Sequence, residues 1–340
     1  MSTVVHNGKK EIVVIGGNDA GLAAAGRAHR LARHASVIVL EKSDHVAFAS
    51  CGLPYFLSGQ LSEKAVSGPG AESLQAKRGF EVRTGQQVLA IDGQKHLLQV
   101  RDVKRDRVYE HSFTKLIIAT GATALIPQEL KDLKNVFSLR HISDALAIQA
   151  FLQQHAVRHI VIVGAGYLGL ELADALASRG FGVSLVEREA CPTHLPETFL
   201  PILQQSLREN RVSWHGAVKA PAWQYDGSRV QSFRAGVDSP WQPVDMVLVA
   251  AGVRPASELA RQAGLRIGVH DTIQVNSYQQ TSRPDIYAVG DCCSTKNLVS
   301  NLPAWMPLAG IAARQGRVAG ENAIGGRDRK STRLNSSHRI

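Results

Sequence analysis

The fold of this chain is decided by one stretch, His159-Ile160-Val161-Ile162-Val163-Gly164-Ala165-Gly166-Tyr167-Leu168-Gly169. The apolar run predicts a buried strand, and the three glycines predict the tight turn that joins such a strand to a helix. We expect that helix over residues 170–178 and a second strand over residues 183–186, followed by Glu187. At such a turn backbone N–H groups bind a pyrophosphate, and an acid about 20 residues further on binds ribose hydroxyls. The stretch therefore predicts a dinucleotide-binding βαβ unit.

The residues after the second strand leave the choice of coenzyme open. Glu187 favours the free 2′-hydroxyl of NADH, because its carboxylate can accept hydrogen bonds from the ribose. Arg188 weakens that preference, since an arginine at this place can bind the 2′-phosphate of NADPH.

A second unit of this kind lies near the start of the chain. The apolar residues 12–15 lead to Gly16-Gly17-Asn18-Asp19-Ala20-Gly21, a helix over residues 22–33 and a strand over residues 37–40 that ends at Glu41. Asn18 takes the place of the middle glycine, and asparagine tolerates left-handed backbone better than most residues. Two such units predict two bound dinucleotides.

A single cysteine follows the first unit, in Ala49-Ser50-Cys51-Gly52-Leu53-Pro54-Tyr55. A helix beginning near residues 52–54 would favour the reactive thiolate, and Pro54 suits a first helical turn. Phe56 and Leu57 occupy the region where a second cysteine would allow an internal dithiol. Two dinucleotides and one thiol predict an electron path from nicotinamide through flavin to sulfur. Cys51 would form a mixed disulfide with a small thiol, or cycle through sulfenic acid with peroxide or oxygen.

These patterns predict an α/β fold with two Rossmann-like nucleotide-binding domains, each a three-layer ββα arrangement, the second inserted into the first. We expect residues 1–115 and 246–327 to form the FAD-binding domain and residues 116–245 the NAD(P)-binding domain. The chain is expected to return to the first sheet through residues 246–252 and 286–291. Residues 80–115 alternate apolar and polar, with turn signals at Asp92-Gly93 and near Asp106, which predicts a small antiparallel β layer.

Composition limits the remaining possibilities. The 340 residues are enough for two domains, and the net charge of +10 favours a phosphate-rich partner. Nucleic acid is not expected, because no dense Lys/Arg stripe with interleaved aromatics is present. The four cysteines have no zinc-finger spacing, so we expect no metal site and a reducing cytoplasm. Neither a signal peptide nor a membrane-spanning run is expected.

The last thirteen residues, 328–340, have no apolar period. Back-translated, residues 328–338 resemble a common short-read sequencing adapter in frame. We therefore expect residues 328–340 to be a non-native, adapter-like tail and the natural protein to be longer.

Together these residues resemble the flavoprotein pyridine nucleotide-disulfide oxidoreductase family, nearest its single-cysteine branch of coenzyme A-disulfide reductases, NADH oxidases and NADH peroxidases. The matching stretches are residues 12–25, 41–59, 116–122, 159–187, 246–255, 281–291 and 307–326. The most specific of them is Thr281-Ser282-Arg283-Pro284-Asp285-Ile286-Tyr287-Ala288-Val289-Gly290-Asp291.

The resemblance implies FAD and either NADH or NADPH as cofactors, with Cys51 as the redox centre. It implies that Asp291 bonds the FAD ribityl chain, that Arg140 contacts FAD, and that Tyr167 and Glu171 border the nicotinamide and the flavin ring. The cofactor-binding positions that it implies are Gly16, Asn18, Ala20, Gly21, Glu41, Lys42, Thr120, Gly121, Arg140, Gly164, Gly166, Tyr167, Leu168, Gly169, Glu171, Glu187, Gly252, Asp291 and Ala309.

The identity of the electron acceptor remains undecided, because different residues resemble different branches of the family. Residues 51–55 resemble the coenzyme A-disulfide reductases, whereas Ala47 and Ser50 depart from them, and Ser50 is closer to the oxidases and peroxidases. Asp19 stands where the peroxidases carry a histidine, and an aspartate donates a proton only if its pKa is raised. We expect an NAD(P)H-dependent reductase of coenzyme A disulfide, a persulfide or a polysulfide. The alternatives are an NADH oxidase that uses a Cys51 sulfenate and a low-turnover flavoprotein sensor or inactive fragment.

The resemblance also implies a homodimer. In the family a C-terminal interface domain forms the dimer, and residues of the partner subunit complete the disulfide site. The sequence contains no such domain after residues 325–326. We therefore expect dimerisation of this chain to be impaired.

Overall fold

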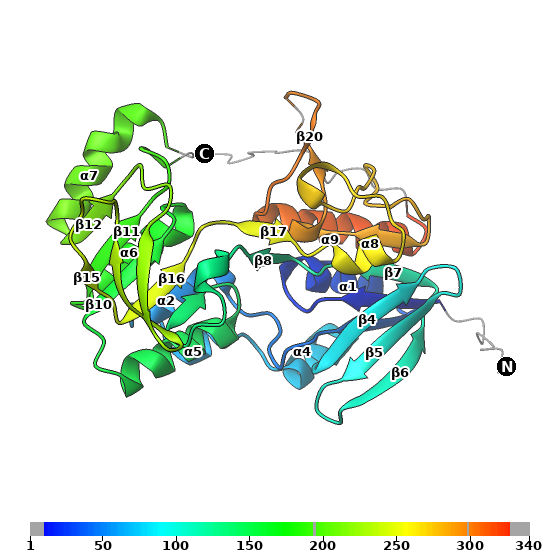
Figure 1. The fold of residues 1–340 in the computed structure, drawn as a ribbon. Coiled ribbons are helices and arrows are strands. Elements are labelled where there is room, and N and C mark those ends of the chain that lie inside the picture. Colours follow the sequence, from blue (N-terminus) through cyan, green and yellow to red (C-terminus); the bar gives the residue numbers. More distant parts are fainter. Residues whose placement is uncertain (1–9, 193–194, 298, 327–340) are drawn as a thin grey trace, which may run out of the picture. The chain divides into compact units, whose positions relative to one another are not determined.

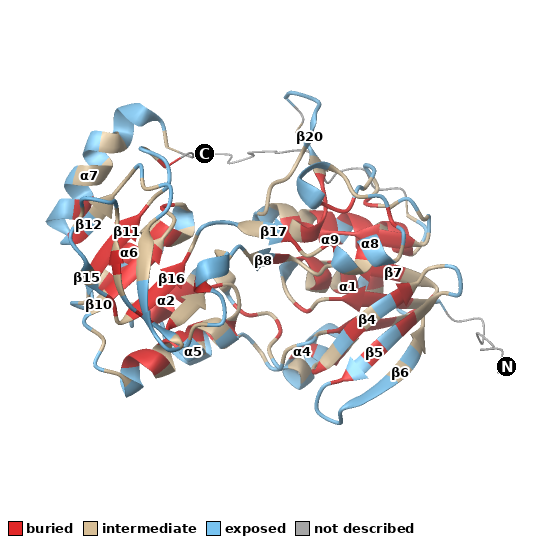
Figure 2. Ribbon diagram, viewed as in Figure 1, coloured by how far each residue is buried: buried red, intermediate tan, exposed pale blue. Residues whose placement is uncertain are grey.

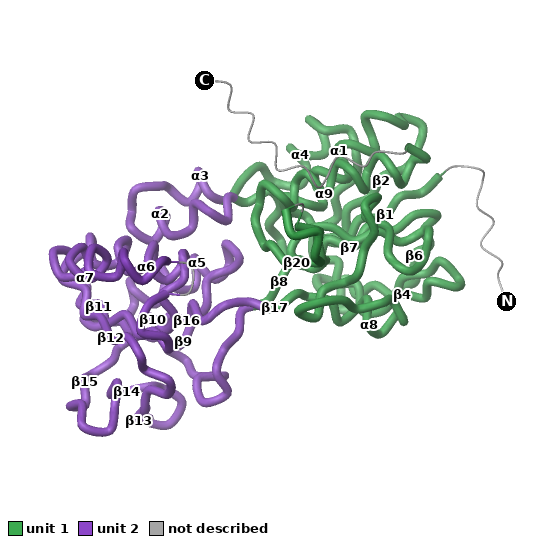
Figure 3. The backbone as a smooth tube through the Cα atoms, turned by 90° about the horizontal axis from the view of Figure 1, so that it is seen from above, with its two compact units in different colours: residues 1–48, 67–123, 254–340 green, residues 49–66, 124–253 purple. Residues whose placement is uncertain are grey.

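A computed structural model describes residues 10–192, 195–297 and 299–326 (Figure 1). The predicted non-native tail, residues 328–340, lies outside the described residues. The chain forms two compact units (Figure 3). Unit 1 comprises Met1–Phe48, Ser67–Thr123 and Arg254–Ile340, and unit 2 comprises Ala49–Val66 and Ala124–Val253. Among the described residues, no helix is both long enough and apolar enough to cross a membrane.

Unit 1 is built on a five-stranded parallel sheet. Its strand order is β18 (Ile286–Ala288), β7 (Lys115–Ile118), β1 (Glu11–Ile15), β2 (Ser36–Leu40) and β3 (Glu81–Arg83). Helices α1 (Asp19–Leu31) and α9 (Ala309–Ala323) pack on one another. The antiparallel sheet of β4 (Gln86–Asp92), β5 (Leu97–Asp102) and β6 (Arg107–Ser112) is the predicted small β layer. Its smaller elements are α4 (Ala71–Arg78), α8 (Glu258–Gln262), β19 (Thr295–Lys296) and β20 (Pro303–Ala304).

Both faces of this sheet are buried, as its unbroken apolar strands require (Figure 2). Ile12 and Val14 of β1 belong to the core shared with α1 and α9. Val13 and Ile15 belong to a second core, shared with β4 and β5. Because successive strand residues point to opposite faces, one apolar strand serves both layers, which confirms the predicted three-layer ββα fold.

Unit 2 repeats this plan. Its parallel sheet has the order β12 (Val212–His215), β11 (Gly182–Val186), β10 (His159–Val163), β16 (Met246–Val249) and β9 (Val136–Ser138). An antiparallel layer of β13 (Ala222–Asp226), β14 (Arg229–Arg234) and β15 (Gln242–Pro243) shares a core with it. The helices of this unit are α2 (Leu53–Leu57), α5 (Ile142–Gln154), α6 (Tyr167–Ala177) and α7 (Leu200–Glu209), with α3 (Glu63–Ser67) at its boundary. The chain passes between the units within β8 (Ala122–Ala124) and β17 (Val253–Pro255).

The same glycine contact joins strand to helix in both units. A β-carbon on Gly21 would lie 1.9 Å from the carbonyl oxygen of Gly16, and one on Gly169 would lie 1.9 Å from that of Gly164. Gly16 and Gly164 have φ of 111° and 101°, a region that only glycine adopts without strain. The first and last glycines of each turn are therefore fixed by sterics.

The middle position of the turn has no such requirement. Asn18 has an ordinary extended φ of −117°, so its tolerance of left-handed backbone, which we invoked from the sequence, is not used. Gly166, its counterpart, has φ of −66° and open space around a β-carbon. A side chain at this position therefore causes no backbone strain.

The units differ from the expected domain boundaries in three places. The expected return of residues 246–252 to the first sheet is wrong, because β16 pairs with β10 in unit 2. Strand β7, expected beyond the boundary at residue 115, pairs with β1 in unit 1. Residues 49–66, expected in the first domain, belong to unit 2, where α2 packs on α5 and α6. An apolar run predicts a strand but not the sheet that the strand joins. Periodicity alone therefore could not assign these segments to a domain.

We predict that Gly21→Ala destabilises unit 1 by about 1–3 kcal/mol, because the new methyl group meets a backbone oxygen that cannot move aside. Gly26→Ala, in the same helix, is the matched control. Its β-carbon would lie 3.7 Å from Phe80, an ordinary contact, so this change should be neutral or stabilising by up to about 1 kcal/mol. Denaturant unfolding followed by circular dichroism measures both variants, and equal stability of the two would contradict the prediction.

Candidate functional site

In unit 1 the strand-to-helix turn leads to a pre-arranged acid. The Glu41 carboxylate, at the end of β2, accepts hydrogen bonds from the backbone N–H of Gly17 at 2.8 Å and of Ser43 at 2.8 Å. Because α1 begins at Asp19, its first N–H groups point toward the carboxyl end of β1. This arrangement offers donors for a pyrophosphate and an acceptor for ribose hydroxyls.

Other expected residues of unit 1 gather around the same strand ends. A β-carbon on Gly16 would lie 2.2 Å from the carbonyl oxygen of Ala119, which follows β7. The hydroxyl of Thr120 donates to the carbonyl of Ala256 at 2.6 Å, and Gly121 has φ of 73°. A β-carbon on Gly290 would lie 2.9 Å from that of Ala20. Unit 1 thus holds Gly16, Asn18, Ala20, Gly21, Glu41, Lys42, Thr120, Gly121, Asp291 and Ala309.

The Asp19 carboxyl of unit 1 has a raised pKa. Burial first, and then the negative charge of Asp291, raise the pKa of the Asp19 carboxyl, although Asp19 keeps an accessible surface. A raised pKa is the direction of shift that proton donation by this aspartate requires.

Unit 2 presents the same geometry a second time. The Glu187 carboxylate accepts from the backbone N–H of Ala165 at 2.7 Å and of Glu189 at 3.1 Å. A β-carbon on Gly164 would lie 2.5 Å from the carbonyl oxygen of Ala250, which follows β16. Unit 2 thus holds Gly164, Gly166, Tyr167, Leu168, Gly169, Glu171, Glu187 and Gly252, together with Arg140.

The remaining expected site residues lie at the starts of α6 and α5. Tyr167 opens α6 with 69% of its surface exposed, and Glu171 lies one turn further on. Burial raises the pKa of the Glu171 carboxyl. Arg140 precedes α5. Its backbone N–H and the backbone N–H of His141 each donate a hydrogen bond to the Asp144 carboxylate at 2.8 Å.

Cys51 lies in a short 3₁₀ turn, Ser50–Gly52, and its free thiol is exposed. The helix that follows, α2, is a single turn of five residues, with Pro54 in its first turn as expected. Leu53, Phe56 and Leu57 are buried, and the Leu57 carbonyl accepts a hydrogen bond from Arg179 of unit 2 at 2.7 Å. Buried leucines therefore anchor the segment and leave the thiol accessible.

Two backbone contacts escaped the sequence analysis. The carbonyl groups of Ala119 and Ala250 close against the first glycine of each turn. The signal was present, because Ala119-Thr120-Gly121 and Ala250-Ala251-Gly252 each follow an apolar strand with the same spacing.

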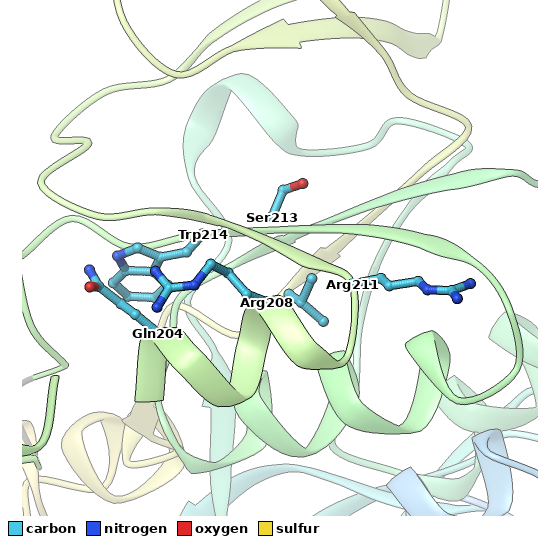
Figure 4. A pocket seen from close by; sticks show the side chains of 6 residues that line it. Gln204, Arg208, Arg211, Ser213 and Trp214 are labelled. Atoms are coloured by element: carbon cyan, nitrogen blue, oxygen red, sulfur yellow. The ribbon is translucent and has the colours of Figure 1, made fainter. Parts of the chain in front are cut away.

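The groove shown in Figure 4 lies at another edge of unit 2. Its volume is about 440 Å³, and it is lined by Gln204, Arg208, Arg211, Val212, Ser213 and Trp214 of α7 and β12. None of these lining residues belongs to the glycine turn, residues 164–169, and Glu187 is not among them either. In the described part of the chain, no group of three or more His, Cys, Asp or Glu side chains could hold a metal ion.

Comparison with known proteins places this geometry in a family. The sequence profile of the family described as pyridine nucleotide-disulphide oxidoreductase matches residues 10–316. The chain therefore belongs to this family, whose members are FAD- and NAD(P)H-dependent oxidoreductases.

Three of the curated relatives show how the names differ within the family. The NAD(P)H coenzyme A polysulfide/persulfide reductase of Pyrococcus horikoshii is 32% identical, with 94% of this chain and 71% of the relative covered. The NADH oxidase of Methanocaldococcus jannaschii is 33% identical, with 92% and 70% covered. The coenzyme A disulfide reductase of Staphylococcus haemolyticus is 27% identical, with 94% and 71% covered.

Two solved structures that superimpose on this chain carry names of the same kind as these relatives. The reduced CoADR-RHD of Bacillus anthracis superimposes with a TM-score of 0.89 at 29% identity, over 94% of this chain. The NAD-dependent persulfide reductase of A. fulgidus superimposes with a TM-score of 0.87 at 31% identity, also over 94% of this chain. The chain spans only 58% and 60% of the lengths of these two proteins.

The residues present fit the family's two cofactors. Each turn combines close glycines, helix N–H groups and an acid held by two backbone N–H groups. At the first turn the side-chain oxygen of Asn18 is buried without a hydrogen-bond partner. A buried polar atom of this kind is satisfied when a polar ligand binds beside it.

We predict that unit 2 loses stability in mild acid. Burial lowers the pKa of His159 and of His215, and the charge of His159 lowers that of His215 further, while Asp245 partly opposes the shift of His159. Unfolding exposes both rings, whose pKa then returns to about 6.5, so the unfolded chain binds more protons below that pH. Stability should therefore be full above about pH 6.5 and fall as the pH drops below it.

Denaturant unfolding at a series of pH values measures this effect. His215→Phe is the comparison variant, because His215 packs against Phe233 at 5.6 Å between ring centroids and its Nε2 is buried without a hydrogen-bond partner. Its stability should depend less on pH. A wild-type stability that does not change between about pH 7.5 and 5 would refute the prediction.

Proposed function

We propose that this chain passes electrons from NAD(P)H through FAD to Cys51 and on to a small disulfide, which is coenzyme A disulfide, a persulfide or a polysulfide. The observation that carries this proposal is the exposed, free thiol of Cys51 in a chain with two dinucleotide turns. No other cysteine occurs in the sequence before Cys191, and Cys292 and Cys293 are buried. The names of the relatives include both coenzyme A disulfide and persulfide reductases.

The two turns would take different cofactors. We assign FAD to unit 1, where Glu41 would bind the adenosine ribose and the carboxylate of Asp291 the ribityl chain. NAD(P)H would bind unit 2, with its pyrophosphate at residues 164–169 and its ribose at Glu187. FAD, when bound, accepts a hydride from NAD(P)H and supplies two electrons for the reduction of sulfur.

At Cys51 the chemistry is a thiol–disulfide exchange. The thiolate attacks one sulfur of the substrate, its S–S bond breaks, and one thiolate leaves while the other half stays bound to Cys51 as a mixed disulfide. Two electrons then break the mixed disulfide, release the second thiolate and regenerate Cys51. The accessible position of the thiol suits an attack on a substrate from solvent.

An NADH oxidase is the second candidate. It would reduce oxygen through a Cys51 sulfenate. A relative named NADH oxidase supports the same candidate. Reoxidation of the reduced protein by air rather than by a disulfide would decide for it.

We further propose that the full-length protein is a homodimer in a reducing compartment, and that dimerisation of these 340 residues is impaired. Val299, Leu302 and Leu308 of unit 1 expose 94%, 64% and 56% of their surfaces, which supports an apolar contact with another chain. Four free cysteines support the compartment. Light scattering and activity assays of the purified 340 residues test the assembly, and a monodisperse, fully active dimer would refute the proposal.

We predict that Cys51→Ser lowers turnover with coenzyme A disulfide or polysulfide about a hundredfold or more, because the nucleophile is lost. Binding of FAD, and its bleaching by NADH under anaerobic conditions, should persist, since unit 1 is unchanged. Cys191→Ser, at a half-buried free thiol, is the control and should leave turnover unchanged. An unaltered rate with every acceptor in the Cys51 variant would exclude the thiol mechanism, and a flavin that NADH cannot bleach would favour a sensor or an inactive fragment.

A further inference from the structure

We propose that Arg179 is a positioning residue for Cys51, because its guanidinium holds the C-terminal end of α2 and so fixes the place of the thiol on unit 2. The inference rests on the proposed function, which makes Cys51 the redox thiol. Arg179 follows α6, and it belongs to the same unit as the Cys51 segment, residues 49–66.

The last carbonyl group of α2 is satisfied by the Arg179 side chain. A helix leaves the carbonyls of its last turn without partners inside the helix. In α2 the carbonyls of residues 54–56 accept from backbone N–H groups of residues 58–61. Among the described residues, no backbone N–H donates to the Leu57 carbonyl, which accepts from Nη1 of Arg179 at 2.7 Å. Because Leu57 is fully buried, loss of Arg179 would leave this carbonyl without a partner.

The guanidinium of Arg179 is itself held in place. Its Nη1 also donates to Oε1 of Gln149, on α5, at 3.2 Å. Its central carbon lies 5.2 Å from the centroid of the Phe181 ring, within the range of a cation–π contact. The Arg179 backbone is fixed too, since its N–H donates to the Leu176 carbonyl of α6 at 3.1 Å. One planar group therefore ties α2 to both α5 and α6.

The hydrogen bond from Arg179 adds a constraint that apolar packing does not supply. The buried side chains of α2 hold it against α5 and α6, but apolar contacts have no preferred direction. A hydrogen bond has a preferred distance and angle, so it fixes the position of α2 along its own axis. The start of the Cys51 segment is bonded within the segment itself, where the Ala49 N–H donates to the Val66 carbonyl at 2.8 Å. The register of this segment on unit 2 therefore depends on Arg179.

A shift of α2 is passed directly to Cys51. Residues 50–57 are helical without a break, because the 3₁₀ turn that contains Cys51 is followed at once by α2. A reacting group that is displaced by about 1 Å can lose up to about a hundredfold in rate. Arg179 thus acts on the reaction through the place of the thiol and not through contact with the substrate.

The test compares two electron acceptors on the FAD-loaded protein. One is coenzyme A disulfide or polysulfide, whichever the wild type reduces faster, and the other is ferricyanide, an oxidant that needs no thiol. We expect Arg179→Met, which removes the donor and keeps an apolar stem, to lower turnover of the sulfur acceptor about tenfold and to leave that of ferricyanide unchanged. Arg179→Lys keeps a cationic donor and should restore most of the loss.

Hydrogen exchange gives a readout that does not depend on turnover. The backbone N–H groups of residues 58–61, which are bonded to carbonyls of α2, should exchange several-fold faster in Arg179→Met. Arg208→Met is the matched control, since it removes an arginine from the last turn of α7 in the same unit, and it should change neither the exchange nor the two rates. Arg179→Gln, whose side chain is shorter, carries the test if the methionine variant does not retain flavin.

The outcomes separate this inference from the proposed function. An equal loss with both acceptors would show a general weakening of unit 2 and would overturn the positioning role. Wild-type turnover of the sulfur acceptor in Arg179→Met, or unchanged exchange at residues 58–61, would overturn it as well and leave the electron path standing. Turnover of the sulfur acceptor that persists in Cys51→Ser would instead overturn the proposed function.

Discussion

The contact on which each unit depends lies between two glycines of one turn. The carbonyl oxygen of Gly16 takes the space of a β-carbon on Gly21, and the carbonyl oxygen of Gly164 takes that space on Gly169. Since no side chain fits there, the helix can start directly at the end of the strand. The close approach also brings the acid on the next strand within hydrogen-bonding distance of the turn, as the bonds of Glu41 to Gly17 and of Glu187 to Ala165 show.

The same packing continues in unit 1 beyond the turn. Gly316 and Gly320 of α9 lie against the backbone of α1, where a β-carbon would come within 2.2 Å and 2.3 Å of the carbonyl oxygens of Ala20 and Ala24. This contact holds the N-terminus of α9 near residues 290–291, so the cofactor-binding positions of three distant segments meet at one end of the sheet. The ion pair of Arg27 with Glu321 adds a polar contact between the same helices.

Much of this was predictable because strong local patterns specified it. The glycine spacings and the apolar strands predicted both βαβ units, and the alternation of residues 80–115 predicted the antiparallel layer. The errors have one cause. β16 is as apolar as β7, and Leu53, Phe56 and Leu57 pack on unit 2 although they follow the first unit in sequence. By composition, a buried apolar segment could pack in the core of either unit. Long-range packing decides which core it joins.

The sequence by itself determined the class of fold, the two nucleotide turns, the acids at residues 41 and 187, and the single thiol near the first unit. These follow from sterics and hydrogen bonding within some thirty residues, the length of a βαβ unit. Tertiary structure alone decided which sheet each later strand joins, that the segment of Cys51 is anchored in unit 2, and that burial, and then the charge of Asp291, raise the pKa of Asp19. Each of these depends on residues far apart in the chain, whose burial and mutual charge exist only once the chain has folded.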